Sequence, residues 1–221
     1  MEFKVRIEDK KYLTHDVLQF TLEKPEGFTY SAGQAVEASP DDPKFKNDWA
    51  PFTLTSLNRD KFLQFTIKIY SAHNGMTRAL SKLNLGDSFL ITDPWDSFIS
   101  KGPGVFIAGG AGVTPFIALL RQMYVDGTVG ESTLLFSNKT EDDIFLADEF
   151  KKVLGKNFIN IITRDEKSSF YGGRINRQLL KKYISNFHQP FYLCGPDNFA
   201  NDIKSALLKL GAGDEMVNIS L

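Results

Sequence analysis

The segment Ile107–Leu120, with the sequence IAGGAGVTPFIALL, has the residue types and spacing of a phosphate-binding turn. Its first apolar run ends at three glycines, Gly109, Gly110 and Gly112. A threonine and a proline, Thr114 and Pro115, precede the second apolar run. Glycines let backbone N–H groups approach an anion closely, and a helix N-terminus adds further donors. The segment therefore predicts a strand, a loop for a nucleotide pyrophosphate, and a helix that Thr114 caps.

Two commoner phosphate-binding patterns do not fit this segment. Pro115 stands where the G-x-G-x-x-G pattern has its last glycine, and no Lys-Ser/Thr pair follows as in a Walker loop. A tight strand-to-helix turn that binds no ligand is the alternative interpretation.

Polar and charged residues follow two other predicted strands. The sequence FYLCGP places Cys194, Gly195 and Pro196 at the end of one strand, and IITR places Arg164 at the end of another. Open α/β sheets bind ligands outside the carboxyl ends of their strands, where a guanidinium can contact a phosphate. Arg174 lies a short loop beyond Arg164. Surface arginines that bind no ligand are the alternative.

The elements that would position these residues belong to the second of two dissimilar halves. From Phe3 to about Ile99 the chain shows short, β-branched or aromatic strands, which favour a small antiparallel barrel. After Gly104, apolar strands alternate with helices, which is typical of a parallel sheet covered on both faces. We therefore predict a six-stranded antiparallel β-barrel domain over residues 1–100 and a doubly wound α/β domain over residues 101–221.

Composition excludes several classes of function. The net charge of −1 argues against nucleic-acid binding, and the charged N-terminus and short apolar runs argue against a signal peptide or a membrane span. A single cysteine, Cys194, excludes an internal disulfide and a cysteine-ligated iron–sulfur cluster. The histidines show no ligand spacing, so we predict no metal site. We expect a cytoplasmic protein.

The order of these features resembles the ferredoxin–NADP reductase family of flavoproteins. A barrel is followed by GG-x-G-x-TP and then by CGP, and the likeness covers nearly the whole chain. The resemblance implies that the barrel binds flavin, that the α/β domain binds NADPH or NADH, and that nicotinamide meets isoalloxazine. It further implies that Gly110, Gly112 and Thr114 hold the pyrophosphate and nearby ribose of NAD(P)H, and that Cys194, Gly195 and Pro196 lie beside the nicotinamide.

On the flavin side, the resemblance rests on two shorter motifs. In APFTLTS, Phe52 takes the position of a family tyrosine, where it would pack either on the flavin or in the barrel core. Thr53 takes the position of the residue nearest the reactive nitrogen of the flavin. The position of the family arginine is Ala50. The motif Gly-x-Ser/Thr-x-x-Leu is intact, so its first three residues, Gly75, Met76 and Thr77, suit a flavin phosphate.

With Ala50 at the position of the family arginine, the motif has no cation to contact the flavin phosphate, and it does not specify FAD or FMN. Lys68, on a strand whose family counterpart contacts the isoalloxazine edge, is a candidate to replace the arginine, as is Arg78; a solvated strand lysine is the alternative. We predict FAD, with FMN as the alternative.

The resulting hypothesis is hydride transfer from NADPH or NADH to bound FAD, with Thr53 and Cys194 nearest the reacting rings. Electrons would pass singly to a separate carrier such as flavodoxin or ferredoxin. The alternatives are reduction of free flavin, of a haem protein or of an oxygenase partner, and a non-catalytic electron-relay subunit. Because Arg164 and Arg174 can converge on a 2′-phosphate, we favour NADPH, although Asp165 and Glu166 would suit the ribose hydroxyls of NADH.

Overall fold

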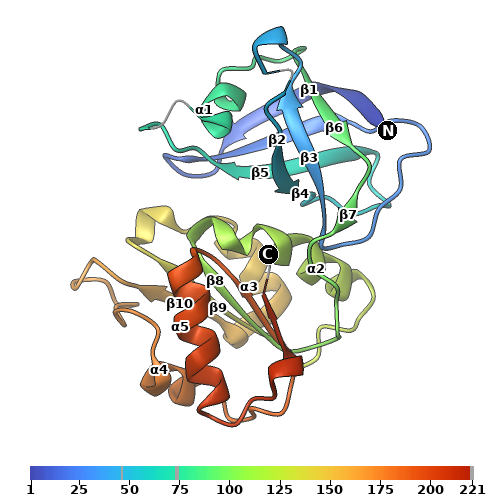
Figure 1. The fold of residues 1–221 in the computed structure, drawn as a ribbon. Coiled ribbons are helices and arrows are strands. Elements are labelled where there is room, and N and C mark those ends of the chain that lie inside the picture. Colours follow the sequence, from blue (N-terminus) through green and yellow to red (C-terminus); the bar gives the residue numbers. More distant parts are fainter. Residues whose placement is uncertain (46, 73–74, 220–221) are drawn as a thin grey trace. The chain divides into compact units, whose positions relative to one another are not determined.

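The computed structural model describes residues 1–45, 47–72 and 75–219. Its chain forms two compact units (Figure 1). The barrel unit comprises Met1–Ser100 and Ile117–Gln122, and the α/β unit comprises Lys101–Phe116 and Met123–Leu221. Within the described ranges, no helix has the length and apolar character needed to cross a bilayer.

The barrel unit is built from antiparallel strands in the order β4-β3-β6-β1-β2-β5. A bridge between Leu54, directly after β4, and Phe65 of β5 joins the two ends of this sheet and nearly closes it. The elements are β1 (Glu2–Tyr12), β2 (Val17–Glu23), β3 (Gln34–Pro40), β4 (Ala50–Thr53), β5 (Phe62–Lys68), α1 (Met76–Ser81), β6 (Ser88–Thr92) and β7 (Trp95–Asp96). The prediction of a six-stranded barrel is confirmed, with β7 as a two-residue addition that pairs with β3.

Alternation along β5 explains the barrel core. Leu63, Phe65 and Ile67 belong to the buried apolar cluster, because successive strand residues point to opposite faces. The residues between them are polar and yet buried: Gln64 is 9% and Thr66 4% exposed. Buried polar groups need partners, and Arg121 supplies one by donating to Gln64 Oε1 at 2.8 Å and to the Thr55 carbonyl at 2.6 Å.

The α/β unit contains a parallel sheet in the order β10-β9-β8-β11-β12. Its strands are β8 (Val105–Gly109), β9 (Thr133–Asn138), β10 (Phe158–Ile162), β11 (Phe191–Cys194) and β12 (Val217–Ile219). The connecting helices are α2 (Thr114–Val125), whose middle part Ile117–Gln122 is counted with the barrel unit, α3 (Ala147–Leu154), α4 (Arg177–Tyr183) and α5 (Asp197–Leu208). The chain leaves β8 toward β10 and then returns to β11 on the other side, so the strand order reverses between β8 and β11.

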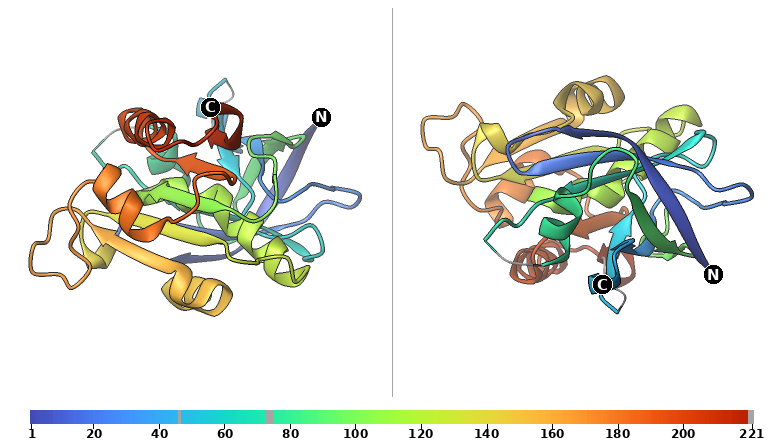
Figure 2. Two further views of the ribbon diagram at one scale, coloured as in Figure 1. Left: turned by 90° about the horizontal axis from the view of Figure 1, so that it is seen from below. Right: turned by 90° about the horizontal axis from the view of Figure 1, so that it is seen from above.

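Helices cover both faces of this sheet (Figure 2). On one face, Val105 and Ile107 pack in a cluster with residues of α4 and α5, such as Leu180 and Ile203. On the other face, Phe106 contacts Phe116 of α2 with ring centroids 5.2 Å apart. The sheet is therefore doubly wound as predicted, and its reversal point is where such sheets bind ligands.

Candidate functional site

The glycine-rich segment lies at the carboxyl end of β8, at the reversal point of the sheet. Gly110–Val113 form a 3₁₀ turn that runs directly into α2. Gly110 has a φ of +54°, a left-handed conformation that favours glycine, and a Cβ there would meet no atom within 4 Å. Gly109 is the N-cap of the turn and has no side chain that could accept a hydrogen bond from the N–H groups of the turn. Open space and uncapped donors fit an external anion.

The prediction that Thr114 caps the helix is wrong. Thr114 is the first residue of α2 and has helical dihedral angles, φ −57° and ψ −44°. The helical run already begins one turn earlier, because the 3₁₀ turn precedes the α-helix, and so the capping position moves back to Gly109.

Gly112 is required because β11 passes directly beside it. A Cβ at Gly112 would lie 2.2 Å from the Cys194 carbonyl oxygen and 2.6 Å from the Gly195 nitrogen. These are backbone atoms, which cannot rotate away as a flexible side chain can. The structure therefore brings together two predicted site segments, Gly110–Thr114 and Cys194–Pro196, that lie about 80 residues apart in the sequence.

Phe199 completes this packing and was not predicted from the sequence. Its ring lies on α5, where a Cβ at Gly195 would approach it to 2.7 Å and a Cβ at Gly109 to 3.2 Å. Two glycines on the paired strands β8 and β11 leave room for this aromatic ring over the carboxyl ends of both strands. The one sequence signal was the position of Phe199 three residues beyond the CGP motif, a spacing that by itself assigns no contact.

Cys194 is half-buried at the end of β11, and Pro196 is exposed and precedes α5. Burial raises the pKa of the Cys194 thiol to about 11, and a hydrogen bond involving the Gly195 backbone opposes this only in part. The thiol is therefore protonated at neutral pH, whereas a nucleophilic cysteine needs its thiolate. This environment suits a neutral neighbour of a ligand.

The loop after β10 brings Arg164 and Arg174 to the same strand end. The Arg164 N–H donates to the Lys139 carbonyl at 3.0 Å, and the Gly173 N–H donates to the Ile162 carbonyl at 3.2 Å. Both arginine side chains are exposed. Asp165 accepts a hydrogen bond from the Lys167 N–H at 3.1 Å, so one of its carboxylate oxygens is engaged within the loop. Arginine groups are thus available to an anion at this strand end.

In the barrel unit, Thr53 and Phe52 lie at the end of β4. Both are half-buried, and Thr53 pairs with Ala35 of β3. The Thr53 hydroxyl has no hydrogen-bond partner among the described residues, which leaves its proton available to a ligand atom. Phe52 packs against the barrel core, with its ring centroid 6.2 Å from that of Phe65. The solvent-exposed part of the Phe52 ring is the surface that a flavin could contact.

The motif Gly75-Met76-Thr77 forms the beginning of α1. Gly75 is the N-cap, it supplies no capping side chain, and a Cβ there would meet nothing within 4 Å. The Thr77 hydroxyl accepts a hydrogen bond from the Tyr70 N–H at 3.2 Å, so the hydroxyl proton can be donated to a different acceptor. Met76 packs its side chain on the barrel core and contributes only backbone here. Uncapped donors beside open space fit a flavin phosphate.

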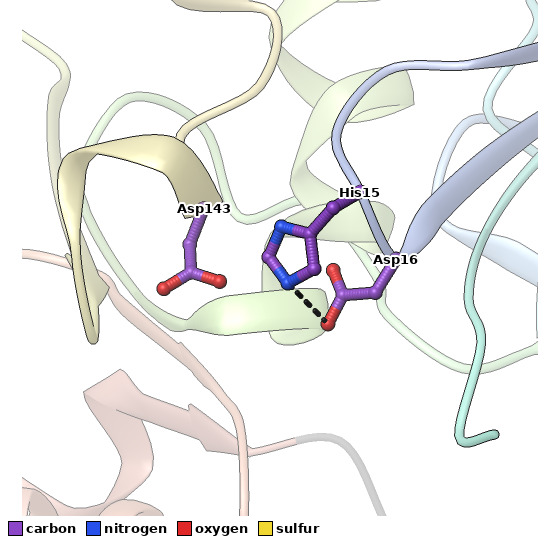
Figure 3. Close-up of side chains that lie close together, drawn as sticks. All are labelled: His15, Asp16 and Asp143. Carbon is purple, nitrogen blue, oxygen red and sulfur yellow. Dashed lines mark ion pairs between the residues drawn. The ribbon is translucent and has the colours of Figure 1, made fainter.

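Lys68 has a partner that the sequence did not indicate. Its ammonium lies 2.7 Å from a carboxylate oxygen of Asp16, and the two side chains are only 17% and 23% exposed. Asp16 also lies 3.6 Å from the exposed His15 (Figure 3). The interpretation of Lys68 as a solvated strand lysine is therefore wrong. The charge of Lys68 is balanced by Asp16, so Lys68 is a poor substitute for the arginine that Ala50 replaces. Another histidine of the sequence, His73, lies outside the described residues.

Two family descriptions together match most of the chain. Residues 2–102 match the FAD-binding domain, and residues 106–205 match the oxidoreductase NAD-binding domain. Cytochrome b5 reductase 4 of Rattus norvegicus is 26% identical over 95% of this chain and 45% of its own length. NADH-cytochrome b5 reductase 2 of Mycosarcoma maydis is 30% identical over 86% of this chain and 60% of its own length. The chain thus spans about half of each relative.

The fold also matches solved structures. A ferredoxin NADP+ reductase from Neisseria gonorrhoeae with bound FAD and NADP superposes with a TM-score of 0.85 and 18% identity, covering 99% of this chain and 98% of that one. With a nearly closed barrel, a doubly wound sheet and matches to both domain models, the chain is a flavoprotein oxidoreductase that joins an FAD-binding domain to an NAD-binding domain, and it has the two-domain fold of a ferredoxin NADP+ reductase.

Proposed function

We propose that this chain transfers a hydride from NADPH or NADH to FAD and passes the electrons to a separate protein. The observation that carries the proposal is the approach of Gly112 to Cys194 and Gly195, because it places uncapped N–H groups at the reversal point of a doubly wound sheet. FAD, when bound, would accept two electrons together and release them singly. The side chains need only bind, orient and shield the two cofactors.

In the α/β unit, the proposed roles follow from position. Gly110 and Gly112 let the turn donate backbone hydrogen bonds to the pyrophosphate, and the Thr114 hydroxyl adds one donor at the start of α2. The protonated Cys194 thiol, with Gly195 and Pro196, forms the surface for the nicotinamide.

In the barrel unit, the Thr53 hydroxyl is the proposed donor to the flavin ring, and Phe52 packs on that ring. The Gly75 turn with the Thr77 hydroxyl is the proposed phosphate site. Lys68 orients Asp16 and β5 rather than neutralising the phosphate. Because Ala50 supplies no cation, we expect weaker FAD binding than with an arginine, by about 1.5–3 kcal/mol for one charge-assisted hydrogen bond.

For the acceptor we propose a small one-electron carrier, flavodoxin or ferredoxin, since this chain has no cluster cysteines of its own. A haem protein is the second candidate, favoured by the relatives that are named cytochrome b5 reductases. The first candidate is supported by the ferredoxin NADP+ reductase that superposes along almost all of both chains.

Anaerobic titration tests the proposal. Protein saturated with FAD and then desalted should keep its visible flavin absorption, and one equivalent of NADPH should bleach it. Oxidised flavodoxin, ferredoxin and cytochrome b5 are then offered in turn, and the first two should restore the colour faster. Loss of all flavin on desalting would contradict the cofactor assignment. Retained flavin that no pyridine nucleotide bleaches would instead support the electron-relay alternative.

A further inference from the structure

Two consecutive buried polar residues, Ser137 and Asn138, end β9 at the edge of the sheet that carries the glycine turn. They are only 8% and 5% exposed. Among the described residues of the α/β unit, two other polar side chains are buried, and both have partners. The Ser132 hydroxyl accepts a hydrogen bond from the Gly104 N–H at 3.3 Å, and Asp143 accepts one from a backbone N–H of its own turn at 2.9 Å. By contrast, no hydrogen bond joins the side chain of Ser137 or Asn138 to a described residue.

The Asn138 carboxamide is a buried group that lacks a hydrogen bond. Its Nδ2 atom is enclosed by the protein and has no partner. Buried polar groups in native proteins are nearly all hydrogen-bonded, because leaving one without a partner is unfavourable. One other side-chain atom of the described residues is in the same state, Asn160 Oδ1, but Asn160 lies in the middle of β10. Asn138 differs in position, because it lies at a strand end, where sheets of this kind bind their ligands.

The register of the sheet places these two residues between the two proposed anion sites. Ser137 pairs with Gly109, directly before the glycine turn. Asn138 pairs with the residue two positions before Arg164. The strand β9 lies between β8 and β10, and neighbouring strands are about 4.8 Å apart, so the glycine turn and the arginine loop are separated by roughly 10 Å. A nucleotide with its pyrophosphate at the turn and its 2′-phosphate at the arginine loop must therefore cross the end of β9.

The group of NADPH that lies between its pyrophosphate and its 2′-phosphate is the adenosine ribose. A ribose hydroxyl both donates and accepts hydrogen bonds, and so do a serine hydroxyl and a carboxamide. Because the carboxamide of Asn138 rotates about its Cβ–Cγ bond, it can turn either its nitrogen or its oxygen to a ligand. The backbone that carries it is fixed, since the Asn138 carbonyl accepts bonds from the N–H and the hydroxyl of Thr163 at 2.9 and 3.0 Å.

We infer that Ser137 and Asn138 bind the adenosine ribose of NAD(P)H through its 3′-hydroxyl, the hydroxyl of this ribose that NADPH and NADH share. This inference rests on the proposed function, because it takes the turn after Gly109 as the pyrophosphate site. Both side chains are neutral, so they strengthen the binding of the two nucleotides alike. The choice between NADPH and NADH is then left to the charged loop that carries Arg164 and Asp165.

The test uses ADP and 3′-deoxy-ADP, which differ only in the 3′-hydroxyl of the adenosine ribose. Their dissociation constants are measured by calorimetry on the full chain saturated with FAD, so that ADP cannot enter the flavin site, and urea unfolding gives the stability of each variant. The variants are Ser137→Ala, Asn138→Leu and the two combined. Matched controls carry the same substitutions elsewhere: Ser132→Ala directly before β9, and Asn160→Leu in the middle of β10.

Each single variant should raise the ADP dissociation constant about three- to tenfold, the loss of one hydrogen bond, while both controls stay within about twofold. In the unmodified protein, 3′-deoxy-ADP should bind about three- to tenfold more weakly than ADP, and this ratio should fall to about one in the combined variant. Neither Ser137→Ala nor Asn138→Leu should lower the urea midpoint by as much as Ser132→Ala, which deprives the Gly104 N–H of its acceptor.

An ADP affinity that Ser137→Ala and Asn138→Leu leave unchanged would overturn the inference, and so would a combined variant that still distinguishes 3′-deoxy-ADP from ADP as the unmodified protein does. Equal losses of ADP affinity in Asn138→Leu and Asn160→Leu would indicate a general effect on the sheet and would also refute it. Ser137→Ala removes a single oxygen atom and keeps the test decisive if Asn138→Leu does not fold. An unmodified protein that binds neither ADP nor NADPH refutes the proposed function as well; normal ADP binding that does not depend on the 3′-hydroxyl refutes the inference alone.

Discussion

The substitution Gly112→Ala tests the packing at the centre of the α/β unit. A methyl group at this position would lie 2.2 Å from the Cys194 oxygen, 2.4 Å from the Cys194 carbonyl carbon and 2.6 Å from the Gly195 nitrogen. Inserting a group into well-packed surroundings costs about 1–3 kcal/mol, and backbone neighbours cannot move independently of their strand. We therefore expect a loss near the upper end of that range, about 3 kcal/mol.

Gly110→Ala is the matched control, two residues away in the same turn. A Cβ at Gly110 has nothing within 4 Å, so the only penalty is the left-handed backbone at φ +54°. That conformation costs a residue with a Cβ roughly 1–2 kcal/mol. At about 3 °C of melting temperature per kcal/mol, Gly112→Ala should lower the melting temperature by about 9 °C and Gly110→Ala by about 3–6 °C.

The assay is thermal unfolding followed by helical circular dichroism, because α3, α4 and α5 lie wholly within the α/β unit. NADPH affinity is measured on the same variants and should fall more in Gly112→Ala, where the turn must move away from β11. If Gly112→Ala melts at or above Gly110→Ala, the turn does not pack on β11 and this account of the site is refuted.

Three further predictions concern binding and pH. Gly110→Asp should weaken NADPH binding about tenfold relative to the isosteric Gly110→Asn, since both residues tolerate a positive φ and only one carries a charge that opposes a phosphate; equal affinities of the two variants would argue against an anion at the turn. Arg164→Ala should lower the ratio of kcat/KM for NADPH to that for NADH roughly ten- to a hundred-fold, and a protein that prefers NADH, or an unchanged ratio, would refute the choice of NADPH. Burial raises the pKa of Cys194 to about 11 and that of Tyr30 to about 12, so the folded state holds these protons more tightly than the unfolded chain. The contribution of these two groups to the free energy of unfolding should therefore be constant near neutral pH and decline as pH rises from about 9 toward 12. Urea unfolding from pH 7 to 11 measures this decline, and it should become smaller in Tyr30→Phe, whereas stability that increases with pH would contradict it.

Much of the architecture was predictable because it follows from local pattern. Alternating residues predict the barrel strands, and continuous apolar runs separated by helices predict a doubly covered parallel sheet. The glycine loop and the CGP motif could be assigned to strand ends for the same reason, and the topology of such sheets then predicts that these ends meet. A local pattern encodes which face of an element is buried, and that is sufficient to specify the type of fold.

Polar pairings and close approaches were decided only by the tertiary structure. Asp16 neutralises Lys68 because the register of β2 on β5 sets Val17 opposite Lys68, and a strand pattern does not specify its register partner. Lys10 meets Ser81 across more than 70 residues of sequence, and Gly112 meets Cys194 across more than 80. The sequence by itself determined which elements form and which motifs follow the strands, but not which residue caps the helical run before α2. Only folding decided which of those residues touch, because a contact depends on the distance between two separately positioned backbones and not on the sequence around either one.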